Sequence, residues 1–248
     1  MIDFRWGMIV EYMPLFINGM KMTLGITLIA VVFGTLIGLF MGMARLAEGK
    51  HGLNKILLRW CVRFPATLYV TFFRGTPLFV QILLIHFALM PSLIHPTDGI
   101  LLSGELAREI RQNYGAFASG LLALTLNAGA YITEIFRAGI QSIDKGQMEA
   151  ARSLGLSYGQ AMKHVIVPQA FRRMLPPLGN EAIMLLKDTS LVSAIGLAEL
   201  AFAARTVAGV YSRYWEPYLT ISVLYLCLTM LMAWGVSSLE KRYQLKSR

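Results

Sequence analysis

Apolar side chains follow one another along this chain in long blocks with few polar breaks. Three blocks contain no Asp, Glu, Lys or Arg over at least the length of a bilayer-crossing helix, about 20 residues. They cover residues 22–44, 112–133 and 217–239. A water-soluble fold has little reason to contain three such blocks, so the pattern predicts three membrane-spanning helices.

Two further blocks are apolar but carry polar interruptions. The first contains Arg74, Gly75 and Pro77, and the second contains Glu181, Lys187, Asp188 and Glu199. Because Pro77 lacks a backbone donor and clashes with the preceding turn, we expect the helix to break or kink at Arg74, Gly75 and Pro77. Counting both blocks, the sequence predicts an all-α integral membrane protein. It would be a single domain over residues 1–248 with five transmembrane helices, at 20–45, 62–90, 112–136, 175–203 and 216–240.

The composition agrees with a chain that lies in lipid. Hydrophobic residues make up 56% and charged residues 15%, with a mean hydropathy of +0.56, whereas soluble domains carry about 25% charged residues. The net charge of +9 raises the question of nucleic-acid binding. The basic residues lie at the ends of the apolar blocks rather than along one face, so we exclude a nucleic-acid partner.

The basic residues concentrate on alternate connecting segments, which predicts an orientation. Positive loops face the cytoplasm, so the N-terminus is expected outside and the C-terminus in the cytoplasm. A four-helix arrangement would break the alternation. The segment 91–111 then lies outside, as a loop with a short surface helix. The basic residues on the predicted cytoplasmic side are Arg45, Lys50, Lys55, Arg59, Arg63, Arg137, Lys145, Arg152, Lys163, Arg172, Arg173, Lys241, Arg242, Lys246 and Arg248.

The longest predicted cytoplasmic segment, 144–168, contains a short helix. Gly146 precedes residues 147–154, Glu149 lies in the first turn where the helix dipole favours an acid, and Gly155 suits a C-terminal stop. Ala150 and Ala151 are small, so another protein surface could approach closely. A helix of this length is too short to be stable alone. It therefore needs a partner, or, in the alternative reading, lies on the membrane surface.

This segment resembles the EAA loop of bacterial ABC importer permeases. The match consists of Glu149-Ala150-Ala151, three residues, Gly155, nine residues, then Val165-x-Val167-Pro168. Val165 and Val167 stand where the family pattern has Ile and Leu. The resemblance implies that Glu149, Ala150, Ala151, Gly155 and Pro168 belong to a coupling segment that docks in a groove of an ATP-binding subunit.

Two other stretches narrow the resemblance. Residues 72–78 with Gln81, and residues 187–191, are similar to the histidine/glutamine permease group, which imports polar amino acids. The resemblance implies a type I importer permease in the bacterial cytoplasmic (inner) membrane, paired with a second permease as a homodimer or heterodimer. ATP-binding subunits would lie on the cytoplasmic face. A substrate-binding protein would dock outside, around 91–111 and 204–216.

The sequence contains no chemistry of its own that would drive transport. Gly49-Lys50 is followed by His51 and lacks the upstream glycine of a phosphate-binding loop. The partner subunits would therefore bind ATP and Mg, and we expect no cofactor, metal site or catalytic residue in this chain, which is thus not an enzyme. A secondary amino-acid transporter that works without an ATPase is the alternative, but it would need no docking helix.

Polar residues at membrane depth are costly and mark pathways. Asn127 in the third predicted helix and Lys187, Asp188, Thr189 and Ser190 in the fourth lie near mid-depth, and Asn180 and Glu181 precede them in the fourth. These seven residues are the candidates for the pathway. In a pathway for a zwitterion, Asp188 and Glu181 could accept from the ammonium, and the Asn, Thr and Ser side chains could donate to the carboxylate. Alternatively, Lys187 and Asp188 pair with one another or with a second subunit. Glu134 and Arg137, spaced i and i+3, are expected to form an ion pair.

Overall fold

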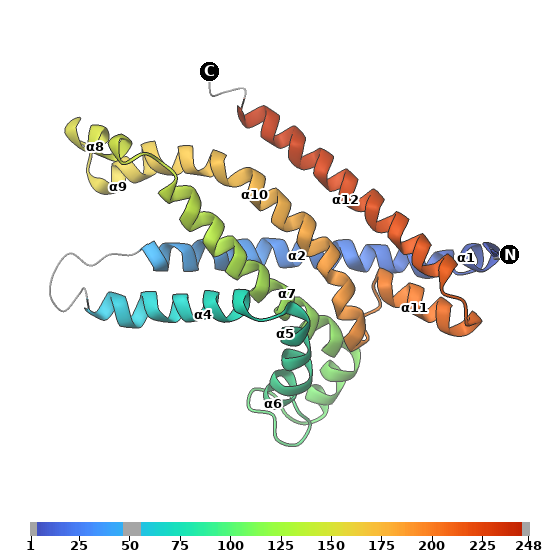
Figure 1. Ribbon diagram of the computed structural model, residues 1–248. Coiled ribbons are helices and arrows are strands. Elements are labelled where there is room, and N and C mark those ends of the chain that lie inside the picture. Colours follow the sequence, from blue (N-terminus) through green and yellow to red (C-terminus); the bar gives the residue numbers. More distant parts are fainter. Residues whose placement is uncertain (1–3, 47–55, 245–248) are drawn as a thin grey trace.

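The computed structural model describes residues 4–46 and 56–244 (Figure 1). Lys50, Lys55, Lys246 and Arg248, which the charge argument uses, lie outside the described residues. Over the described ranges the chain is helical, with no strand beyond an isolated bridge between Ile94 and Leu102. The predicted all-α membrane fold is thus confirmed.

The helices follow in chain order, with short π and 3-10 segments (labelled η) joining several of them. They are α1 (Gly7–Glu11), α2 (Met13–Leu46), η1 (Leu58–Arg63), α4 (Phe64–Gly75), α5 (Leu78–Leu84), η2 (Ile85–Leu89), α6 (Met90–Leu93), α7 (Glu105–Gln141), α8 (Lys145–Ser153), α9 (Tyr158–Ala161), η3 (Met162–Ile166), α10 (Val167–Asp188), η4 (Thr189–Ile195), α11 (Leu200–Tyr211) and α12 (Trp215–Gln244).

Three of these helices, α2, α7 and α12, are each long and apolar enough to cross a bilayer. Each contains one of the uninterrupted apolar blocks. The segment expected to be a loop with a surface helix is a loop over 94–104, and its helical part forms the first turns of α7.

The other two predicted helices are each divided. Leu58–Gly75 and Leu78–Leu93 meet at 109°, so α5 and α6 turn away from α4 (Figure 1). Pro77 stands between them in an extended conformation, with ψ of 134°. Tyr158–Ile195 and Leu200–Tyr211 meet at 47°. The described part therefore has up to five spans, if each bent pair counts as one.

The predicted span over 175–203 is made of more than one helix in the structure. The helix α10 starts earlier, at Val167, and ends at Asp188. A 3-10 segment follows and ends at Gly196, whose φ of +87° places it in the left-handed region that glycine tolerates best. Glu199 then caps α11 by accepting from the Phe202 N–H at 2.8 Å.

Close packing of α2 on α7 forms the centre of the fold. Gly34, Gly38 and Gly42 recur every four residues and lie on one face of α2, against α7. A Cβ atom added at Gly38 would come within 2.7 Å of the Ile132 Cβ. Small residues at this spacing let membrane helices approach closely. The α2–α7 pair thus provides a fixed frame on which the two bent segments lie.

Candidate functional site

The predicted coupling helix corresponds to α8, which runs over Lys145–Ser153 rather than 147–154. It begins two residues earlier than expected, so Gly146 lies inside the helix and Glu149 lies beyond its first turn. Asp144 caps its first turn by accepting from the Gly146 N–H at 2.7 Å, and Gly155 ends it with φ of +85°. The helix lies with α9 at one end of the molecule, far from α1 (Figure 1). Leu154, which follows the last residue of α8, is 82% exposed there and is accessible to another protein.

Most of the predicted coupling residues are accessible. Glu149, Ala150, Gly155 and Pro168 are exposed, whereas Ala151 is buried against the rest of the chain. Ala151 therefore holds the helix in place, and its neighbours present the surface.

Hydrogen bonds connect this segment to α10. The Gln169 amide donates to Gln147 Oε1 at 3.2 Å and to the Val165 carbonyl at 2.9 Å. Arg173 donates to the Ser142 carbonyl at the end of α7. The base of α10 is thus hydrogen-bonded to α8 through Gln169 and Gln147, and to the end of α7, just before α8, through Arg173.

A cavity of about 660 Å³ lies between α7 and α10. Two of the predicted pathway residues, Asn180 and Glu181, line it, together with Arg74, Tyr131 and Glu134. The residues that line this cavity do not include Asn127, Lys187, Asp188, Thr189 or Ser190. The structure thus brings part of the predicted set together and adds Arg74, which the sequence assigned to the helix break.

Asn127 has other partners. Its side-chain amide donates to the Phe73 carbonyl at 3.2 Å and to Gln81 Oε1 at 2.9 Å. The Gln81 amide in turn donates to Phe73 O at 2.8 Å and Thr76 O at 3.0 Å. The carbonyls at the end of a helix lack intrahelical partners, so these two buried amides stabilise the break between α4 and α5. This geometry favours a bracing role for Asn127 over substrate contact.

The other polar residues of the fourth predicted helix lie at its break. The Thr189 hydroxyl is fully buried and donates to the Leu186 carbonyl at 2.7 Å. Lys187 is exposed, and Asp188 and Ser190 are half-buried. These residues remain predicted pathway residues, now placed at the junction of α10 and η4.

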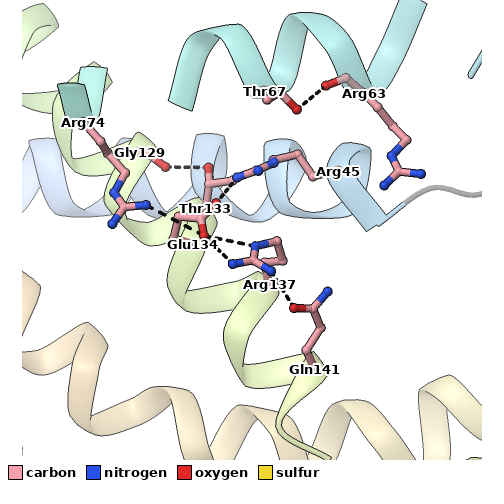
Figure 2. Close-up of polar contacts among 9 residues, drawn as sticks. All are labelled: Arg45, Arg63, Thr67, Arg74, Gly129, Thr133, Glu134, Arg137 and Gln141. Atoms are coloured by element: carbon pink, nitrogen blue, oxygen red, sulfur yellow. Dashed lines mark hydrogen bonds and ion pairs between the residues drawn. The ribbon is translucent and has the colours of Figure 1, made fainter. Parts of the chain in front are cut away.

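Glu134 is the centre of a charge cluster (Figure 2). It pairs with Arg137 at 2.8 Å, as the spacing predicted, and also with Arg45 from α2 and with Arg74 from α4 at 3.8 Å. The Glu134 side chain is 16% exposed. One carboxylate thus holds three guanidinium groups from three helices. Sequence reasoning missed Arg45 and Arg74 as its partners, because their positions are far from Glu134 in the chain.

Two members of the cluster, Arg74 and Glu134, line the cavity. The Arg74 guanidinium lies 5.2 Å from the centre of the Tyr131 ring. Glu181 lines the same cavity. The site therefore offers a cation and an anion to a bound molecule, which matches the two charged groups of a zwitterion.

Comparison with known proteins places the chain in a family. Residues 34–245 match the family described as "binding-protein-dependent transport system inner membrane component". The glutamine transport system permease protein GlnP of Escherichia coli K12 is 35% identical over 98% of this chain and 100% of its own length. The arginine transport system permease protein ArtQ of Bacillus subtilis is 31% identical over 94% of each chain.

Solved structures agree with the sequence relatives. A chain of an amino acid ABC transporter crystallised with histidines superposes with a TM-score of 0.80 at 39% identity, over 97% of this chain and all of that one. A chain of the MetNI methionine ABC transporter reaches 0.72 at 19% identity, covering 93% and 97%, which shows the shared fold. Permeases of this family contain no ATPase site and work with a separate ATPase subunit and a binding protein. The chain belongs to the binding-protein-dependent inner membrane component family, as an amino-acid permease subunit of an ABC importer.

Proposed function

We propose that this chain pairs with a second permease and carries a polar amino acid inward through the cavity between α7 and α10. The observation that supports this most is that Arg74 and Glu181, which carry opposite charges, both line one cavity of about 660 Å³. Arg74 would donate to the α-carboxylate, and Glu181 would accept from the ammonium group, with Asn180 beside it. Charge-assisted hydrogen bonds of this kind are the strong ones.

The drive for transport would come from the partner subunits, which bind ATP and Mg. In this proposal α8 sits in a groove of the ATPase, with Leu154 as its exposed apolar contact. The C-terminus lies on the same, cytoplasmic side and the N-terminus outside. A substrate-binding protein docks on the outer face. Closure of the ATPases on ATP then moves α8, and α10 follows through the hydrogen bonds of Gln169.

A pair of substitutions at Gly155 tests this coupling. The Gly155 φ of +85° is in the left-handed region, and a Cβ there meets nothing within 4 Å. Gly155→Val therefore distorts the end of α8 by backbone strain alone, whereas Gly155→Asn is tolerated because Asn visits this region readily. Both variants are reconstituted with ATPase and binding protein in proteoliposomes, and ATP hydrolysis and labelled amino-acid uptake are measured together.

Uptake per ATP hydrolysed should fall in Gly155→Val and stay near the unsubstituted value in Gly155→Asn. Normal transport by Gly155→Val would contradict the coupling role of α8. The same vesicles test the alternative, because a secondary transporter would accumulate the amino acid from an ion gradient without ATPase or ATP.

A further inference from the structure

A second cavity, of about 690 Å³, lies beside the first turns of α7. Its polar lining comes from His86 on η2 and from Arg108, Arg111, Gln112 and Ser119 on α7. Among the described residues that line it, none is Asp or Glu. The cavity therefore combines two permanent cations with neutral polar groups, and nothing in the function proposed so far uses it.

The spacing of the α7 residues places them on one face of the helix. Positions 108, 111, 112, 115 and 119 recur every three or four residues, so their side chains form a stripe. Arg108 and Arg111 lie one turn apart and repel one another weakly, so an anion between them would be attracted to both. Glu105 is a weak counter-ion, at 3.9 Å from Arg108 and with 85% of its side chain exposed. Gly115, in the middle of the stripe, leaves the cavity open, since a Cβ there would meet nothing within 4 Å.

The hydrogen bonds of Ser119 favour one tautomer of His86. The Ser119 hydroxyl donates its one hydrogen to the Gly115 carbonyl at 2.7 Å. The Ser119 oxygen lies 3.0 Å from His86 Nδ1, so Nδ1 carries the proton and donates to it. In a neutral ring with its proton on Nδ1, Nε2 is an acceptor. The His86 ring and the two arginines line the same cavity.

The cavity lies at the opposite end of the molecule from the coupling helix. From Ser119, the lining residue furthest along α7, to the end of the helix at Gln141 there are 22 residues, which at 1.5 Å per residue is about 33 Å. This exceeds the hydrocarbon thickness of a bilayer, about 30 Å. If α8 faces the cytoplasm, the cavity opens on the outer side, where an amino acid arrives from its binding protein.

We propose that this cavity is an outer binding site for the free amino acid, separate from the cavity between α7 and α10. Arg108 and Arg111 bind the α-carboxylate, and His86 Nε2 accepts from the ammonium group. The inference rests on the proposed transport of an amino acid. It adds a binding site on the outer side, which recognises the amino acid by its carboxylate.

Photolabelling tests the site directly. The permease with its ATPases, in nanodiscs of neutral lipid and without binding protein, is irradiated with a diazirine derivative of glutamine, and labelled peptides are mapped by mass spectrometry. We expect labelling within 86–119. Free glutamine should compete, and glutamine amide, which lacks the carboxylate, should not. The double variant Arg108→Gln/Arg111→Gln should lose labelling about tenfold, as for a lost charge-assisted contact. Gly115→Leu should lose it by filling the space, without a change of charge.

Arg205→Gln is the matched control, because it removes an arginine that does not line this cavity, and its labelling should equal that of the unsubstituted chain. Equal competition by glutamine and its amide would overturn the proposal. So would label outside 86–119, or loss of label when phosphatidylglycerol is added, which would assign the cavity to a lipid phosphate. ATP-dependent uptake is measured in parallel with the same permease and ATPases reconstituted in proteoliposomes together with the binding protein. Uptake there without the labelling refutes the outer site alone, and absent uptake refutes the proposed function.

Discussion

Neutralising Glu134 is expected to destabilise the junction of three helices. Glu134→Gln keeps the shape of the side chain but leaves Arg45, Arg74 and Arg137 facing one another without a carboxylate (Figure 2). Removing one partner of a buried ion pair costs about 3–5 kcal/mol, and exposed pairs contribute about 0–1 kcal/mol. The Glu134 side chain is 16% exposed and that of Arg45 21%. The loss in unfolding free energy should therefore lie between these limits, at about 2–3 kcal/mol.

Thermal unfolding of the detergent-solubilised protein measures this loss. For a chain of this size, 1 kcal/mol shifts Tm by about 2–4 °C, so Tm should fall by about 4–12 °C. Glu105→Gln is the matched control, because its carboxylate is 85% exposed and lies 3.9 Å from Arg108; its Tm should hardly change. A double-mutant cycle with Arg45→Gln should give a coupling energy of about 1–2 kcal/mol. Equal Tm values for the Glu134 and Glu105 variants would refute the reasoning.

Three further substitutions test the frame, the break and the cavity. Gly38→Leu should lower Tm, with a loss of about 1–3 kcal/mol or more in unfolding free energy, because its Cβ would clash with α7. The control Gly25→Leu, where a Cβ meets nothing within 4 Å, should leave Tm unchanged. An unchanged Tm for Gly38→Leu would contradict the packing of α2 on α7. Asn127→Ala should cost about 1–3 kcal/mol by leaving a buried acceptor unpaired, whereas exposed Asn113→Ala should cost nothing measurable in the same scan. Glu181→Gln should raise the KM for uptake about tenfold with basal ATP hydrolysis unchanged, and an unaltered KM would remove Glu181 from the pathway.

Features that depend on neighbouring residues in the chain could be predicted from the sequence. The long apolar blocks correspond to α2, α7 and α12, since a helix in lipid satisfies its own backbone and needs only length and hydrophobicity. The helix α8 could also be predicted, because its cap and its stop are local. The same holds for the ion pair of Glu134 with Arg137, one turn apart.

Features that depend on distant contacts could not be predicted. Depth along a helix indicated Asn127 as a pathway residue, but depth does not reveal which way a side chain points. Its amide turns toward α4 and binds the Phe73 carbonyl, which is free because the helix ends at Gly75. In the same way, the carboxylate of Glu134 is shared with Arg45 and Arg74, which no spacing rule connects to it.

The helix α10 connects the segment that contains α8 with the cavity between α7 and α10. At its base, Gln169 is hydrogen-bonded toward α8, and further along the same helix Asn180 and Glu181 line the cavity. Between them stand Pro176 and Pro177, each of which removes a backbone hydrogen bond from the helix interior and lowers its resistance to bending. Pro177 itself lines the cavity. We therefore expect a displacement of the base to bend α10 at the cavity wall rather than to move the helix as a rod, while α2 and α7, packed through their glycine contacts, stay in place. In the proposed transport cycle, this bending would convert motion at α8 into a change of cavity shape.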